Sequence, residues 1–285
     1  MKLKNHPILI VIITFFNIIQ IIAQTKVIAH RGFSGIAPEN TWIAFQKAID
    51  AGAEYIELDV HKSKDGELFV IHDNTVNRTS SNQKKGFISK MTSKEIQEVK
   101  VGYPKEFGDE FKNERIPTLK EVLKLAKGKI KVCIELKAYD IEEKVLKIVN
   151  ALEMNDQVII FSFYDFVLIN VRKLDSTIPI LYLKYKLEEE KNFNFAKSIN
   201  AFAIGVGYGT KVTKELLDKA HEKGIEIWQS TVNDEKNMYH LINLGLDGLI
   251  TNNPDSALEM VEELQKNTLD ETSIIEKIEP LSNVP

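Results

Sequence analysis

Two acidic side chains within an apolar segment are the residues of this chain best suited to chemistry. Glu57 and Asp59 lie two positions apart in Tyr-Ile-Glu-Leu-Asp-Val, a run typical of a buried strand. Side chains at i and i+2 of a strand share a face, so both carboxylates point into one region. Two like charges placed there are costly unless a cation compensates them, and Mg²⁺ and Ca²⁺ prefer oxygen ligands. Salt bridges to lysines, or a strand with a polar edge, would explain the pair alone equally well.

Further ionisable residues recur where other apolar runs end. His30 and Arg31 close one short run, and His72 closes a second. Glu135 and Lys137 occupy i and i+2 positions in a third. Buried strand ends seldom carry such groups unless the protein uses them. Glu135 taken alone would also be explained as an ion-pair partner of Lys137 or Arg31.

The elements that position these residues alternate regularly along the chain. Strands are expected near residue 27 and at 55–61, 130–136, 158–163, 178–183, 202–206, 225–230 and 247–251. Helices are expected at 41–51, 118–127, 140–154, 164–175, 187–198, 213–223, 234–244 and 254–265. Eight such units in one α/β domain predict a (β/α)8 TIM barrel, whose reacting groups gather at the C-terminal strand ends.

Three segments depart from this alternation. The turn at 64–67 predicts a hairpin, with residues 68–72 antiparallel to the strand at 55–61. Residues 74–115 are predicted to form a small insertion over the barrel mouth, within a barrel domain at 24–265. Residues 266–285 are predicted to be a loose tail.

The N-terminus indicates export. Residues 1–23 are predicted to be a signal peptide, with Lys2 and Lys4 before an apolar run and cleavage before Gln24; a retained N-terminal anchor is the alternative. Cleavage would change the formal net charge from −4 to −6. Cys133 is the only cysteine and is expected to be a packed thiol. With the signal peptide, a secreted or periplasmic location is expected, and an exported chain without disulfides fits a bacterial periplasm better than a disulfide-stapled extracellular domain.

The composition limits the partners. Without a lysine and arginine block, an acidic chain of 285 residues is unsuited to nucleic acid. Once the signal is cleaved, no stable membrane insertion is expected. A small anionic substrate would need its positive charge supplied locally.

Several short motifs occur together, in a fixed order. They are His30-Arg31-Gly32, Pro38-Glu39-Asn40-Thr41, Glu57-Leu58-Asp59-Val60, Asp65-Gly66, His72-Asp73, Arg78-Thr79, Glu135-Leu136-Lys137, Ser162-Phe163 and Asp247-Gly248-Leu249-Ile250-Thr251. Over residues 26 to 262 the chain resembles the glycerophosphodiester phosphodiesterases. The resemblance implies metal-dependent hydrolysis of glycerophosphodiesters to glycerol 3-phosphate and an alcohol.

The resemblance also implies roles for single residues. Glu57, Asp59 and Glu135 match the residues that bind one divalent cation, Mg²⁺ or Ca²⁺. His30 and His72 match the acid/base pair, although the sequence leaves open which is the base. The residues expected to contact the phosphate or substrate, or to orient those that do, are Arg31, Lys137, Glu39, Phe163 and Trp228. Helix capping and first-turn charge would account for Glu39 and Asn40 equally well, and core packing would account for Phe163.

Two positions differ from the family pattern. Ser230 precedes Thr231-Val232-Asn233 where many members have tryptophan, and Trp228 lies two residues earlier. Asn252 follows Thr251 where aspartate is usual. Both changes are expected to affect the preferred alcohol and to leave the metal and acid/base residues untouched.

Three other functions fit the sequence less well. A phospholipase-D-like barrel acting on lipids would need an exposed apolar rim, which the insertion at 74–115 does not offer. A non-catalytic binding protein would not need paired histidines, and a membrane-tethered structural barrel would have to keep its N-terminal segment. His61, His221 and His240 are expected at the surface. The headgroup alcohol and the oligomeric state are left open.

Overall fold

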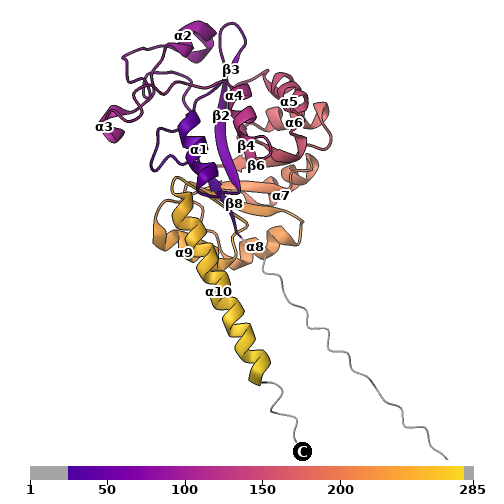
Figure 1. Ribbon diagram of the computed structural model, residues 1–285. Helices are drawn as coiled ribbons and strands as arrows, with labels where there is room; N and C mark the ends of the chain where they lie inside the picture. The colour runs from indigo at the N-terminus through magenta and orange to yellow at the C-terminus, as the bar shows by residue number, and fades with distance from the viewer. Residues whose placement is uncertain (1–24, 279–285) are drawn as a thin grey trace, which may run out of the picture.

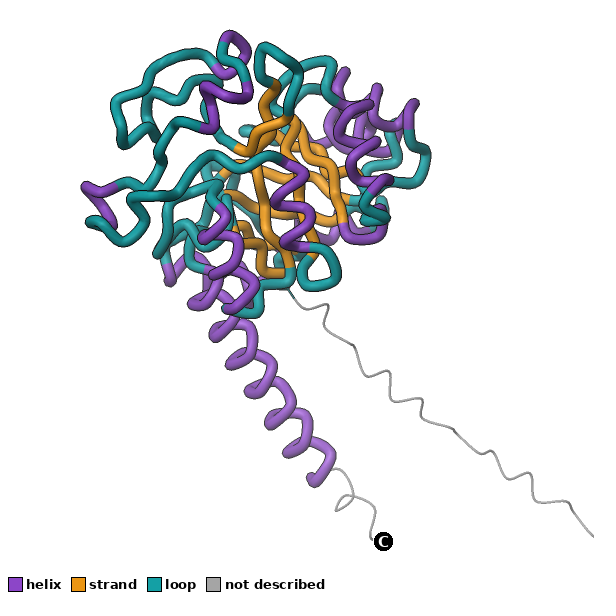
Figure 2. The backbone as a smooth tube through the Cα atoms, turned by 45° about the horizontal axis from the view of Figure 1, so that its top comes forward, coloured by secondary structure: helices purple, strands orange, loops and turns teal. Residues whose placement is uncertain are grey.

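Eight parallel strands form a closed barrel with helices around it (Figures 1 and 2). The computed structural model describes residues 25–278; the predicted signal peptide and its cleavage site lie outside them. The barrel order is β1-β2-β4-β5-β6-β7-β8-β9, and parallel pairing of β1 with both β2 and β9 closes it. The predicted (β/α)8 TIM barrel is confirmed.

The elements follow the predicted order. The strands are β1 Lys26–Ala29, β2 Tyr55–Lys62, β3 Leu68–Val70, β4 Lys131–Leu136, β5 Val158–Ser162, β6 Ile180–Lys184, β7 Ala203–Gly207, β8 Glu226–Ser230 and β9 Gly248–Thr251. The helices are α1 Trp42–Asp50, α2 Ser93–Gln97, α3 Pro104–Phe107, α4 Leu119–Ala126, α5 Glu142–Ala151, α6 Asp165–Leu174, α7 Glu189–Ser198, α8 Lys214–His221, α9 Glu235–Leu244 and α10 Pro254–Ile278. Two 3₁₀ turns, η1 Ile88–Lys90 and η2 Asn155–Gln157, lie between them. β3 pairs antiparallel with β2, as the predicted hairpin requires.

Local sequence signals fix where the helices begin and end. Thr41 caps α1 by accepting a hydrogen bond from the backbone N–H of Ala44. Gly52, just beyond the helix, has a φ of +78°, a conformation that favours glycine. Thr118 and Glu121 form a reciprocal capping box at the start of α4. Such caps set where α1 and α4 begin and where α1 ends.

The barrel interior is filled below the mouth by aromatic and aliphatic side chains. Trp228 is fully buried there, with the rings of Tyr55, Phe161 and Phe202 at 5.6 to 5.8 Å between centroids. Its Nε1 donates to Glu226 Oε2 at 2.8 Å, at the N-terminal end of β8. The prediction that Trp228 contacts substrate is therefore wrong: this ring belongs to the core. Cys133 is buried in the same cluster, as predicted for a packed thiol.

The ends of the barrel domain differ from prediction in one place. The loose tail predicted from residue 266 is wrong as far as Ile278, because α10 continues to that residue. The segment from Asp255 to Ile278 contains no glycine or proline that would end a helix. In the described part of the chain, every helix is too short or too polar to cross a membrane.

Residues 74–115 lie beside the barrel mouth, around α2 and α3 (Figure 1). A small apolar cluster of their own, with Val76, Ile88, Ile96 and Val99 at its centre, holds them against Phe69 of β3. The insertion therefore folds as an appendage of the hairpin.

Candidate active site

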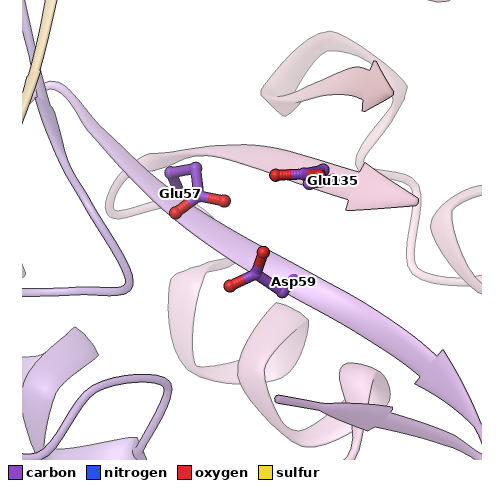
Figure 3. A group of neighbouring side chains, drawn as sticks. All are labelled: Glu57, Asp59 and Glu135. Carbon is purple, nitrogen blue, oxygen red and sulfur yellow. The ribbon is translucent and has the colours of Figure 1, made fainter. Parts of the chain in front are cut away.

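Three carboxyl groups from two neighbouring strands face one another at the mouth (Figure 3). Glu57 and Asp59 project from β2, and Glu135 projects from β4 directly opposite Asp59 in the parallel register. One oxygen from each lies within 4.8 Å of the others. All three side chains are almost fully buried. The i, i+2 spacing on β2 and the pairing with β4 together produce this cluster.

Burial makes this cluster electrostatically costly. Burial, and then the Asp59 carboxylate, raises the pKa of Glu135 to about 7. Burial, followed by the Asp59 and Glu135 carboxylates, raises the pKa of Glu57 well above its usual range. For Asp59, burial opposes ionisation, but Lys137 and Arg31 outweigh it and hold its pKa below its usual range. The three carboxyl groups therefore lack compensating positive charge.

Two cations already contact the cluster. Lys137 Nζ lies 3.2 Å from Glu135 Oε1 and 3.4 Å from Asp59 Oδ1. The backbone N–H of Arg31 donates to Glu57 Oε2 at 3.0 Å, and Arg31 Nε lies 3.5 Å from an Asp59 oxygen. Arg31 Nε is buried and makes no hydrogen bond. When all three carboxyl groups are ionised, the two cations leave one net negative charge, and an all-oxygen donor set of this kind fits Mg²⁺ or Ca²⁺.

His30 follows β1 and is held by a residue just beyond the last strand. Its Nδ1 lies 2.7 Å from Asn252 Oδ1. Burial, and then the Arg31 guanidinium, lowers the pKa of His30 to about 4. The imidazole is therefore neutral over the physiological range.

His72 is held differently, by a carboxylate. Its Nδ1 lies 2.7 Å from Asp73 Oδ1. Arg78 donates to Asp73 through Nε at 2.8 Å and to Glu39 through Nη2 at 2.8 Å. Glu39 in turn accepts from Arg31 Nη1 at 3.0 Å. One chain of charged hydrogen bonds thus connects His72 to Arg31.

An open pocket of about 150 Å³ lies beside this network. Its lining residues are His30, Arg31, Ser34, Ala37, Pro38, Glu39, Tyr103, Glu106, Phe107 and Asn252. The insertion supplies three of these, around α3. Phe163 is not among them: it is half-buried and stacks on Tyr185 with centroids 4.2 Å apart. The pocket is therefore mostly polar and opens on the His30 side of the carboxyl cluster.

Comparison with known proteins identifies the family. A model of the glycerophosphoryl diester phosphodiesterase family matches residues 30–256. The chain belongs to this family. A glycerophosphodiester phosphodiesterase of Caldanaerobacter subterraneus is 37% identical over 244 residues, covering 84% of this chain and 98% of that protein. One of Bacillus altitudinis is 36% identical over 250 residues, covering 85% of this chain and 100% of that protein.

Solved members of the glycerophosphodiester phosphodiesterase family share the fold along nearly their whole length. The enzyme from Agrobacterium tumefaciens superposes with a TM-score of 0.72 at 29% identity, covering 82% of this chain and 99% of that one. A phosphodiesterase of Oleispira antarctica, solved with the product sn-glycerol-3-phosphate, superposes with a TM-score of 0.74 at 25% identity, covering 84% of this chain and 97% of that one.

Within this family fold, two asparagines contact the site in ways that the sequence motifs do not predict. Asn40, considered as a helix cap, instead donates through Nδ2 to Asp59 Oδ2 at 2.8 Å. Its φ of +55° is left-handed, which asparagine tolerates better than most residues. Asn252, expected to leave the acid/base residues untouched, directly contacts His30. Both contacts join segments distant in sequence, so spacing alone could not reveal them.

His61 also differs from prediction. It is buried, and its Nε2 lies 3.1 Å from the carbonyl oxygen of His72. It occupies the same face of β2 as Asp59, and the returning hairpin covers it. The i, i+2 spacing was the available signal, because it extends the Glu57, Asp59 row by one position. His221 and His240 are exposed, as predicted, although His221 pairs with Asp247 at 2.9 Å.

Proposed function

We propose that this protein hydrolyses glycerophosphodiesters to glycerol 3-phosphate and an alcohol, with one divalent cation and two histidines of unequal role. The observation that carries the proposal is the buried carboxyl cluster lying among His30, His72, Arg31 and Lys137. Membership of the family supports the reaction class. The cluster supports the cation, because its carboxylates lack compensating charge.

Glu57, Asp59 and Glu135 would hold the cation. When bound there, Mg²⁺ or Ca²⁺ supplies positive charge that polarises a phosphoryl oxygen. Arg31 and Lys137 bind the remaining non-bridging oxygen. Arg31 suits this role because its buried Nε has no hydrogen-bond partner in the chain, and an unpaired buried donor is costly unless a ligand accepts from it.

His30 is the general base in this proposal. In the amide orientation present, Asn252 Oδ1 only accepts, so the proton of the neutral ring resides on Nδ1. The lone pair of Nε2 is then free to take a proton. The lowered pKa, about 4, keeps the ring in that form at working pH.

His72 is the general acid. Asp73 accepts from its Nδ1, so the other ring nitrogen, Nε2, is the one that can exchange a proton with the substrate. Attack on phosphorus by the neighbouring glycerol hydroxyl, or by water, forms one P–O bond and passes a proton to His30. Cleavage of the bond between phosphorus and the alcohol oxygen releases the alcohol, and this oxygen takes a proton from His72. If the glycerol hydroxyl attacks, a water molecule opens the cyclic ester in a second step with the histidine roles reversed. His72 takes the proton of the water, and His30 returns its proton to the glycerol oxygen that leaves phosphorus.

The test is a panel of glycerophospho-alcohols assayed for glycerol 3-phosphate, with and without EDTA. We expect EDTA to abolish turnover and added Mg²⁺ or Ca²⁺ to restore it. His30→Ala and Glu57→Ala should each lose most activity, whereas His240→Ala, on an exposed face of α9, should not. Turnover that survives both chelation and Glu57→Ala would reject the mechanism. Tight binding without turnover of any diester would identify a binding protein instead.

A further inference from the structure

Three aromatic side chains form a continuous exposed surface at the barrel mouth. This aromatic rim consists of Tyr139 in the loop after β4, Tyr164 after β5, and Phe166 in the first turn of α6. Their ring centroids lie 4.9 to 6.1 Å apart. The three residues are 52%, 39% and 46% exposed. Scattered exposed apolar residues are ordinary, but a contiguous group at a site of chemistry usually contacts a ligand.

The rim adjoins the site on the side away from the polar pocket. Tyr139 lies two residues after Lys137. Burial raises the pKa of the Tyr164 hydroxyl, and the charges of Lys137 and Glu135 both act on this group. Around the barrel, the pocket lies at β9 and β1, the carboxyl cluster at β2 and β4, and the rim at β4 and β5. Figure 1 shows α3, which lines the pocket, and α6 on opposite sides of β2.

This order suits the two halves of a phosphodiester. A phosphate at the carboxyl cluster would extend its glycerol into the polar pocket, beside His30, and its other ester group toward the rim. That orientation also places the proposed base next to the glycerol hydroxyl. We propose that the aromatic rim binds an uncharged hydrocarbon part of the alcohol, so that the enzyme prefers glycerophosphodiesters of apolar alcohols. This inference rests on the proposed function and specifies its substrate class.

The alternative ligand for aromatic rings is a cationic alcohol, and the geometry argues against it. A cation lies within about 6 Å of each ring that binds it, and rings that surround one must stand apart. Here the rings contact one another directly, which leaves no space between them. A quaternary ammonium group would therefore find three rings packed against one another in place of a cage.

The charges beside the rim point the same way. Asp165, between Tyr164 and Phe166 in the sequence, pairs with Lys184 at 3.0 Å. Glu135 pairs with Lys137 at 3.2 Å. Another lysine, Lys62, donates to the carbonyl oxygen of Asp140 at 3.1 Å. Because lysines accompany the carboxylates, the rim offers no strong negative potential to attract a cation.

Two matched substrates test the inference directly. Glycerophosphocholine and glycerophospho-3,3-dimethylbutanol have the same shape, but a neutral carbon replaces the charged nitrogen in the second. We expect kcat/KM for the neutral ester to be at least 10-fold higher. A preference for the choline ester would overturn the inference. Calorimetric Kd values for the same pair in EDTA, where turnover should stop, give the preference even if no diester is hydrolysed.

A chain-length series adds a second readout. From glycerophosphoethanol to glycerophosphohexanol, kcat/KM should rise about 2- to 4-fold per methylene, as expected for partial to full burial. Phe166→Ala and Tyr139→Ala should flatten this rise, and thermal melting curves that match that of the unaltered enzyme show that the variants fold. Leu174→Ala is the matched control, because Leu174 is 53% exposed at the opposite end of α6. A flat series in the unaltered enzyme would overturn the inference.

A longer ester distinguishes a soluble hydrocarbon group from a lipid surface. Glycerophosphododecanol is assayed below and above its critical micelle concentration. High kcat/KM already below that concentration supports binding of a single chain at the rim. A rate that rises only once micelles form would mean docking to a surface and would overturn the inference.

Discussion

Replacing one atom beside His30 should move the pH dependence of the reaction. Asn252→Asp puts a carboxylate where the amide oxygen now lies, 2.7 Å from His30 Nδ1. Opposite charges at that distance attract by about 1.5 kcal/mol in a water-like dielectric and about 6 kcal/mol at an effective dielectric of 20. Since about 1.4 kcal/mol corresponds to one pKa unit, the smaller value already raises the pKa of His30 by about 1.

A carboxylate this close typically changes a pKa by roughly 1 to 3. The pKa of His30 should therefore rise from about 4 to between about 5 and 7 in Asn252→Asp. A base accepts protons only in its neutral form, so activity falls as the pH falls through this pKa. The acid limb of kcat/KM should move upward by the same amount in the variant.

The assay is kcat/KM for one glycerophosphodiester from pH 3.5 to 9, with glycerol 3-phosphate measured in stopped samples. The same saturating cation is present throughout, so its own effect on His30 is common to both enzymes. Asn150→Asp, at an exposed position of α5, controls for the added charge. An active Asn252→Asp enzyme whose acid limb stays in place would refute the assignment of His30 as the base.

Three further predictions concern the carboxyl cluster and the core. Glu57→Gln should abolish cation-dependent turnover but raise the Tm of the protein in EDTA at pH 8, because a buried carboxyl with a raised pKa destabilises the fold once ionised; differential scanning fluorimetry measures this. Asn40→Ala removes a hydrogen bond to Asp59 and should weaken cation binding about 10- to 100-fold by calorimetry. Trp228→Ala should cost about 3–5 kcal/mol in urea unfolding without changing the relative kcat/KM among alcohols, because the ring is entirely within the core.

The arrangement of the carboxyl cluster was predictable because it follows from strand periodicity. Glu57 and Asp59 share a face by their spacing, and register alone places Glu135 opposite Asp59. The C-terminal ends of parallel strands then bring these groups to one mouth. Backbone geometry thus decides which of these side chains meet, and sequence patterns report backbone geometry well.

The depth of a side chain within the barrel was less predictable. Trp228 lies on the strand face that points inward, but the layer it occupies depends on β8 pairing with β9, where Gly248 leaves room for the ring. His61 is predicted at the surface because no family motif requires a residue there, whereas its burial depends on the His72 backbone lying against its ring. In both cases the strand face follows from the sequence, whereas burial depends on a neighbouring segment.

The two histidines show where chemical role is decided. Both follow short apolar strands, so their own sequence context does not distinguish them. The distinction lies in their Nδ1 partners, the amide of Asn252 for His30 and the carboxylate of Asp73 for His72. The amide is neutral, whereas the carboxylate brings a negative charge to the ring that it contacts. Because Asn252 directly follows β9, 222 residues beyond His30, closure of the barrel gives His30 the neutral partner on which the proposal of His30 as the base rests.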